Sequence, residues 1–148
     1  MKFFINVLCA CVIFLSGLTL SQASGFAVGD IQIDHPWARS LPAVSKNGAV
    51  YLTLRNTGSD TDSLVSASTP VADRTEIHTH VHENGMMMMR QVEKVELPGG
   101  GEATLEPGGL HLMLFNINSP MTEAKEFPLT LRFEAAGEVE VTVRVGQQ

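Results

Sequence analysis

Apolar and polar residues alternate along most of this chain, and that alternation restricts its possible folds more than any other feature. It is clearest at residues 31–33, 50–54, 77–81, 110–114, 129–133 and 139–143. Successive side chains of a β-strand point to opposite faces, so a spacing of two predicts strands with one apolar face. No segment keeps the spacing of about 3.6 residues that an amphipathic helix requires. The sequence therefore predicts an all-β fold.

Glycine and proline divide the alternating segments into short pieces. Asn84-Gly85 is the strongest hairpin signal, because a type I′ turn needs positive φ at both central residues. Pro-Gly clusters at 98–101 and 107–109 bracket another short strand, and residues 35–42 predict a rigid extended connection. Eight or so strands in 148 residues, without an internal repeat, predict a single-domain β-sandwich or small barrel.

The first residues have the pattern of a secretory signal. One basic residue precedes an apolar run at residues 3–20, and small or polar residues follow at 21–24. We expect residues 1–23 to be a signal peptide and residues 24–148 to form the folded domain in the periplasm. An uncleaved membrane anchor is the alternative, although polar and small residues interrupt the end of the apolar run.

The cysteines and the net charge exclude several classes of function. Cys9 and Cys11 both lie in the apolar run, so the mature domain would have no disulfide, redox pair or thiolate metal ligand. No lipobox cysteine follows the run, which argues against a lipoprotein. Loss of Lys2 leaves nine basic and sixteen acidic residues, a net charge of −7. We therefore expect no binding to nucleic acid and, after signal removal, none to a membrane.

Histidine and methionine are concentrated in one part of the chain. Residues 78–113 hold four of the five histidines and five of the seven methionines. Imidazole nitrogen and thioether sulfur suit copper(I) better than calcium, magnesium or manganese, and methionine is a poor zinc ligand. A mature domain without cysteine cannot be a blue-copper electron carrier. The composition of this segment predicts a copper(I) site.

A two-residue turn at Asn84-Gly85 would fix which of these side chains face each other. The expected neighbours are His82 with Met87, His80 with Met89, and, diagonally, His78 with Met89. Aliphatic residues occupy the other face, so the ligands would point outward into a shallow, solvent-accessible site. The alternation also places Met86 and Met88 in the core as packing residues. His35, beside a proline and a tryptophan, is expected to be a structural histidine.

Four of these residues have a spacing that resembles a known motif. His78, Met89, His111 and Met113 follow the pattern His-x10-Met-x21-His-x-Met of the PCu(A)C periplasmic copper(I) chaperones. Flanking residues extend the resemblance over essentially the whole mature chain, at 35–39, 84–85 and 107–111. The resemblance implies a cupredoxin-like Greek-key β-sandwich whose four motif residues bind one copper(I).

The resemblance further implies a monomeric metallochaperone that supplies copper to a cytochrome oxidase copper-site subunit or to another periplasmic copper protein. Two alternatives remain, an extracytoplasmic β-sandwich interaction module and a copper scavenger without a delivery role. An enzyme is not expected, because four protein ligands leave no open position for a substrate and no nucleophile accompanies them. Some relatives bind copper(II) in a His/Met-rich tail; without one here, His80 and His82 are candidates for a weaker second site.

Overall fold

The computed structural model describes residues 25–146, and every regular element in that range is a β-strand. The strands are β1 (Gly25–Val28), β2 (Ile31–Ala38), β3 (Asn47–Asn56), β4 (Asp62–Ser68), β5 (Ala72–Glu83), β6 (Met86–Gln91), β7 (Val95–Leu97), β8 (Glu102–Leu105), β9 (His111–Ile117), β10 (Glu126–Phe133) and β11 (Gly137–Val145). The all-β prediction is thus confirmed. The predicted signal peptide, residues 1–23, lies outside the described residues.

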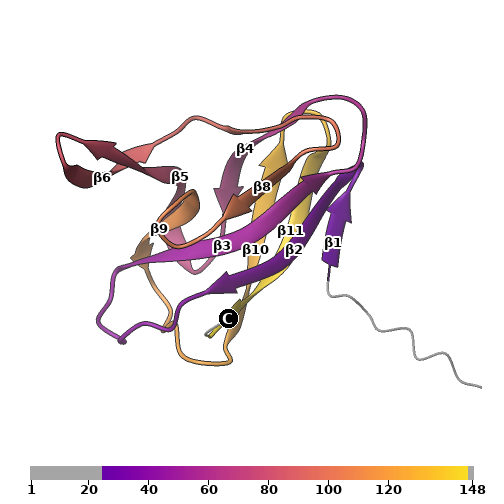
Figure 1. Ribbon diagram of the computed structural model, residues 1–148. Coiled ribbons are helices and arrows are strands. Elements are labelled where there is room, and N and C mark those ends of the chain that lie inside the picture. Colours follow the sequence, from indigo (N-terminus) through magenta and orange to yellow (C-terminus); the bar gives the residue numbers. More distant parts are fainter. Residues whose placement is uncertain (1–24, 147–148) are drawn as a thin grey trace, which may run out of the picture.

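All the strands belong to one sheet, shown in Figure 1. Their order is β6-β5-β9-β3-β2-β11-β10-β4-β7, with β1 added beside β2 and β8 beside β3. Neighbouring strands are antiparallel except β2 and β11, which are parallel. Inward side chains from both halves of this sheet meet in a single apolar cluster, so the sheet curls around one core.

Alternation along the strands builds this core as the sequence predicts. In β11, Val141, Val143 and Val145 are buried, while the residues between them are exposed. In β9, Leu112 and Leu114 are fully buried, and Met113 between them is half-buried. The β5–β6 hairpin differs, because it extends away from the rest of the sheet and all of β6 is exposed (Figure 1). Within residues 25–146, no helix is long and apolar enough to cross a bilayer.

The prediction of an extended connection at residues 35–42 is wrong for its first part, which belongs to β2. Residues 35–38 are part of β2 and not of an extended connection, because a shift in the pairing with β3 between Asp34 and Trp37 accommodates Pro36. His35 lies in this irregularity with φ of 50° and is exposed, so it is not a packing histidine. Strands β1 and β7 are too short to give a clear alternation, and the sequence did not predict them.

Asp62 ties β4 to the turn between β10 and β11. Its Oδ1 accepts hydrogen bonds from the backbone N–H of Ser63 at 2.7 Å and Ala135 at 2.8 Å, and its Oδ2 accepts one from Ala136 at 2.9 Å. Burial raises the pKa of Asp62, but these backbone donors, with Glu134, outweigh it and hold the pKa below its ordinary value. The carboxylate is therefore a structural anion.

Asp62→Ala should lower the free energy of unfolding by about 2 kcal/mol, because it leaves the buried N–H of Ser63 and two partly buried N–H groups without acceptors. Urea unfolding followed by circular dichroism measures the change. Asp60→Ala, at an exposed neighbouring position, is the control and should shift stability by less than about 0.5 kcal/mol.

Because folding depresses the pKa of Asp62, its contribution to the free energy of unfolding is present above pH 3.8 and is lost as the pH falls further. An equal acid sensitivity in Asp62→Ala would contradict this role.

Candidate metal centre

The β5–β6 hairpin has the register that the sequence predicts. His80 pairs with Met89 and His82 with Met87. The turn residues Asn84 and Gly85 have φ of 52° and 78°, as a type I′ turn requires. Pairing continues to His78 opposite Gln91 without a register shift, so no bulge moves His78 opposite Met89. His78 therefore remains diagonal to Met89, while His80 faces it directly.

Strand β9 pairs with the other edge of β5 and brings its own histidine and methionine beside those of the hairpin. His78 lies opposite His111, and Glu76 lies opposite Met113. The centroids of the His78 and His111 rings are 5.9 Å apart, and those of His80 and His111 are 5.2 Å apart. One face of these three neighbouring strands thus carries all of their histidines together with Met87, Met89 and Met113. The sequence predicted the two segments that carry the candidate ligands, but not that the two segments pair directly.

This face is less open than the sequence predicts. His111 is only 3% exposed, because the rings of two β5 histidines lie against it, and Met113 is half-buried. The outer part of the site is open, since Met89 is 51% exposed. The expectation of a shallow, solvent-accessible site is therefore wrong for His111 of β9 and right for Met89 of β6.

The four consecutive methionines of β6 are all exposed, at 63%, 57%, 47% and 51% for Met86, Met87, Met88 and Met89. The prediction that Met86 and Met88 pack in the core is wrong. The hairpin extends past the apolar cluster, and β6 at its outer edge is exposed on both faces. Alternation assigns a residue to a face, but only the neighbouring elements decide whether that face is buried.

His111 is held as a neutral imidazole with a defined free nitrogen. Its Nδ1 lies 3.0 Å from the carbonyl oxygen of Gly109, to which the Nδ1–H donates, so the lone pair is on Nε2. Burial lowers the pKa of His111, as do the nearby His80 and His78, and these effects outweigh the opposing influence of the Gly109 carbonyl. His111 therefore stays uncharged at neutral pH, which is the form that ligates a metal.

His78 has a carboxylate partner and an unsatisfied nitrogen. Its Nε2 donates to the Oε2 of Glu76 at 2.8 Å, while its Nδ1 is buried and has no hydrogen-bond partner. A metal-ligating histidine commonly donates its other ring N–H to a carboxylate, which orients the ring and increases its basicity. The orphaned Nδ1 is what a missing ligand bond would leave.

Glu76 is itself positioned by a second contact. Its Oε1 lies 2.7 Å from the Nε of Arg74, whose guanidinium stacks on the ring of Phe115 at 4.4 Å. The hydrogen bond from His78, aided by the charge of Arg74, outweighs partial burial and holds the pKa of Glu76 below its ordinary value. Phe115 also lies against His78, with 5.9 Å between the ring centroids, and forms an apolar wall beside the site.

The sequence reasoning missed two groups that orient the histidines, the carboxylate of Glu76 and the carbonyl of Gly109. Glu76 lies two residues before His78 and therefore on the same face, so the alternation contained the signal. The Gly109 carbonyl had no such signal, because a backbone group of any residue type can accept a hydrogen bond.

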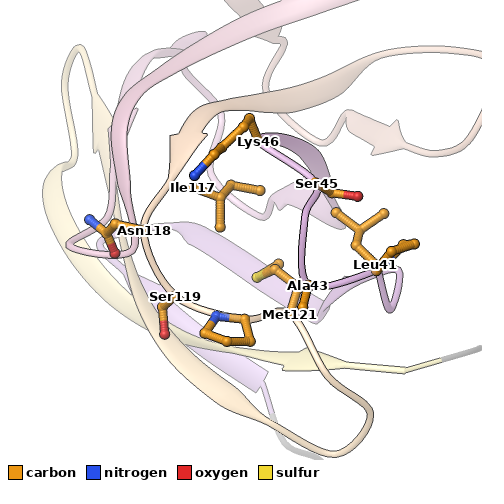
Figure 2. Close-up of a pocket in the computed structure, with 10 residues that line it drawn as sticks. Leu41, Ala43, Ser45, Lys46, Ile117, Asn118, Ser119 and Met121 are labelled. Atoms are coloured by element: carbon orange, nitrogen blue, oxygen red, sulfur yellow. The ribbon is translucent and has the colours of Figure 1, made fainter.

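Histidine, cysteine and carboxylate side chains alone form no metal site in the described part of the chain. No three of them among residues 25–146 are arranged to hold a metal ion. A cavity of about 220 Å³ lies between the loop before β3 and the segment after β9 (Figure 2). The residues that line it include no histidine or carboxylate, and Met121 there is buried.

The sequence matches known proteins over nearly all of the described residues. The model of a family described as "Putative lipoprotein LpqE-like" matches residues 31–145. The chain is 29% identical over 126 residues to "Putative lipoprotein Lxx21020" of Leifsonia xyli subsp. xyli, which covers 84% of this chain and 75% of that protein. It is 31% identical over 114 residues to the uncharacterized protein RP573 of Rickettsia prowazekii, covering 74% of this chain and 63% of that protein.

Solved structures show the same architecture. The apo PCuAC domain from PmoF1 aligns with a TM-score of 0.72 and 27% identity, covering 84% of this chain and 99% of that one. The copper-bound PCuAC domain from PmoF2 aligns with 0.71 and 26%, covering 84% and 98%. The copper(I) form of DR1885 from Deinococcus radiodurans aligns with 0.65 and 26%, covering 86% and 84%. These similarities confirm the cupredoxin-like fold and the resemblance to the PCu(A)C proteins.

Proposed function

Because the chain belongs to the LpqE-like family of PCu(A)C proteins, we propose that it is an extracytoplasmic copper(I) metallochaperone. Copper(I) is its cargo, held on the face formed by β6, β5 and β9. The ion is delivered to the copper site of a cytochrome oxidase subunit or to another periplasmic copper protein. Residues 1–23 act as the export signal and residues 24–148 as the mature monomeric domain.

The ligands in this proposal are His78, Met89, His111 and Met113. The observation that carries it is the pairing of β5 with β9, which puts the His78 and His111 rings 5.9 Å apart with Met113 on the same face. Met89 lies on β6 diagonally to His78, on the same face, and is the second sulfur donor in this proposal. The lone pairs at His78 Nδ1 and His111 Nε2 supply the two nitrogen donors.

The donor set supports copper(I) over other common metals. Two imidazoles and two thioethers are neutral and soft, which suits a monovalent d¹⁰ ion, whereas zinc favours thiolate, imidazole and carboxylate. The ionised carboxylate of Glu76 lies behind His78 and offsets part of the positive charge of the ion. Four protein ligands leave no position for a substrate, so the proposal assigns no catalytic activity.

The proposal is tested by titrating the mature protein with copper(I) against a competing chelator, followed by transfer to an apo oxidase copper domain. We expect one tight equivalent, and metallation of the acceptor that is faster than from the chelated ion alone. Absence of a tight equivalent would contradict the site. Tight binding without transfer to any copper acceptor would instead favour the scavenger.

The exposed methionines of β6 support a second candidate, an interaction module whose hairpin binds another protein. Exposed apolar side chains gathered in one place often mark such a surface, and Met86 to Met89 expose two methionines on each face of the hairpin. Partner binding that keeps full strength without copper, after substitution of the four ligands, would favour this candidate over the chaperone.

A further inference from the structure

The ligand face of the hairpin carries three donors that the four-ligand site does not use. They are His80, His82 and Met87, all on the face that also carries His78 and Met89. Their positions lie progressively farther from β9, toward the turn at Asn84-Gly85. They therefore form a row that connects the partly buried site with the exposed end of the hairpin.

The register places a methionine opposite each of the two histidines. His82 pairs with Met87, and His80 pairs with Met89. The pair that flanks a two-residue turn exchanges both backbone hydrogen bonds, so the next pair outward is of the non-hydrogen-bonded kind, and the kinds alternate. Both His/Met pairs are then non-hydrogen-bonded pairs, in which the Cα atoms approach to about 4.5 Å and the side chains are closest.

The two pairs differ in their surroundings. His80 is half-buried, its Nδ1 lies 3.4 Å from the Gly109 carbonyl, and its ring is 5.2 Å from that of His111. The contact with Gly109 leaves the lone pair of His80 on Nε2, as it does in His111. His82 and Met87 are exposed. His80 thus joins the outer pair to the inner site.

We propose that His82 and Met87 form a second copper(I) site at the end of the hairpin, and that His80 with Met89 passes the ion between this site and the four-ligand site. This inference rests on the proposed function, and it gives that site a route for loading and release. Copper stays monovalent throughout, and each step exchanges neutral nitrogen or sulfur donors one for another. The outer site has two protein donors in contact with water, so it binds more weakly and exchanges faster than the inner one.

The hairpin itself offers a matched control for this proposal. Met86 and Met88 lie on the same strand and are similarly exposed, but they point to the opposite face, where Glu83 and Val81 are their partners. The test variant is His82→Asn with Met87→Leu, and the control is Met86→Leu with Met88→Leu. Neither variant removes an inner ligand or a core residue.

The methionine methyl signals of the labelled mature protein are recorded by NMR during titration with silver(I), a stable monovalent d¹⁰ probe. We expect the first equivalent to shift Met89 and Met113, and the second to shift Met87 in the wild-type and control proteins. In His82→Asn/Met87→Leu the second equivalent should be lost, while affinity for the first stays within about threefold. Transfer of copper(I) from this variant to a chelator should slow at least tenfold.

A Met87 signal that never moves in the wild-type protein, or an unchanged transfer rate in the variant, would overturn the outer site. Failure of the proposed function has a different signature, because Met89 and Met113 would then show no tight first equivalent. The control variant should transfer copper at the wild-type rate. An equal slowing in the control would indicate a general effect of methionine on the hairpin and would also overturn the proposal.

Discussion

Replacing His111 and Met113 together by alanine should abolish tight copper(I) binding. In the proposed site these two residues supply one nitrogen and one sulfur from β9, and without them the remaining proposed ligands lie only on the β5–β6 hairpin. Loss of a group that merely orients a ligand typically weakens a metal site 10–100-fold, so loss of two ligands should weaken it by about 1,000-fold or more. Competition with a copper(I) chelator of known affinity measures the change.

The two β9 residues differ in burial, so the folding of the variant must be checked separately. His111 is 3% exposed, and its replacement leaves a small cavity beside the β5 rings, whereas Met113 is half-buried. Met113→Leu keeps the volume and removes the sulfur, and that single variant should already lose most of the affinity in a folded protein. A tight equivalent that survives in the double variant would show that copper binds elsewhere.

Replacing Glu76 by alanine should weaken copper(I) binding by about 10–100-fold although Glu76 is not proposed as a ligand. The carboxylate receives the Nε2–H of His78 at 2.8 Å and so keeps Nδ1 free and the ring in place. Without it, the ring can rotate or reverse its tautomer. Glu76→Gln retains an acceptor without the charge and should lose less affinity, which separates orientation from electrostatics.

Glu83→Ala is the matched control for this effect. Glu83 lies on the same strand but on the other face, where it pairs with Arg90. Its loss should leave copper affinity within about twofold, because an exposed ion pair contributes little to the structure. If Glu76→Ala and Glu83→Ala weakened binding equally, the effect would come from the net charge of the hairpin and not from the contact with His78.

The parts of this molecule that follow from local rules could be predicted from the sequence. Alternation predicts the buried faces of β9 and β11, and Asn84-Gly85 predicts the hairpin register down to the pairing of His80 with Met89. Each depends on neighbours along the chain or across a two-residue turn. The spacing of the four motif residues also indicated which donor side chains would belong to one metal site.

The parts that depend on distant pairing could not be predicted in this way. Nothing local indicates that β9 lies beside β5, which brings His111 against His78 and buries it. The exposure of Met86 and Met88 has the same origin, because it reflects where the apolar cluster ends and not the pattern of the strand. The closeness of Glu76 to His78 was encoded by the alternation, but its hydrogen bond needed the side-chain geometry.

The place of β6 at one edge of the sheet has a further consequence. It is hydrogen-bonded to β5 on one side only, and all six of its residues are exposed, so its amide protons should exchange with solvent sooner than those of β9. An ion bound by Met89 together with His111 and Met113 would link this edge to a strand two positions away. Loading would then slow deuterium uptake at residues 86–91, so hydrogen exchange of the β6 amides would report when the ion binds and when it is released.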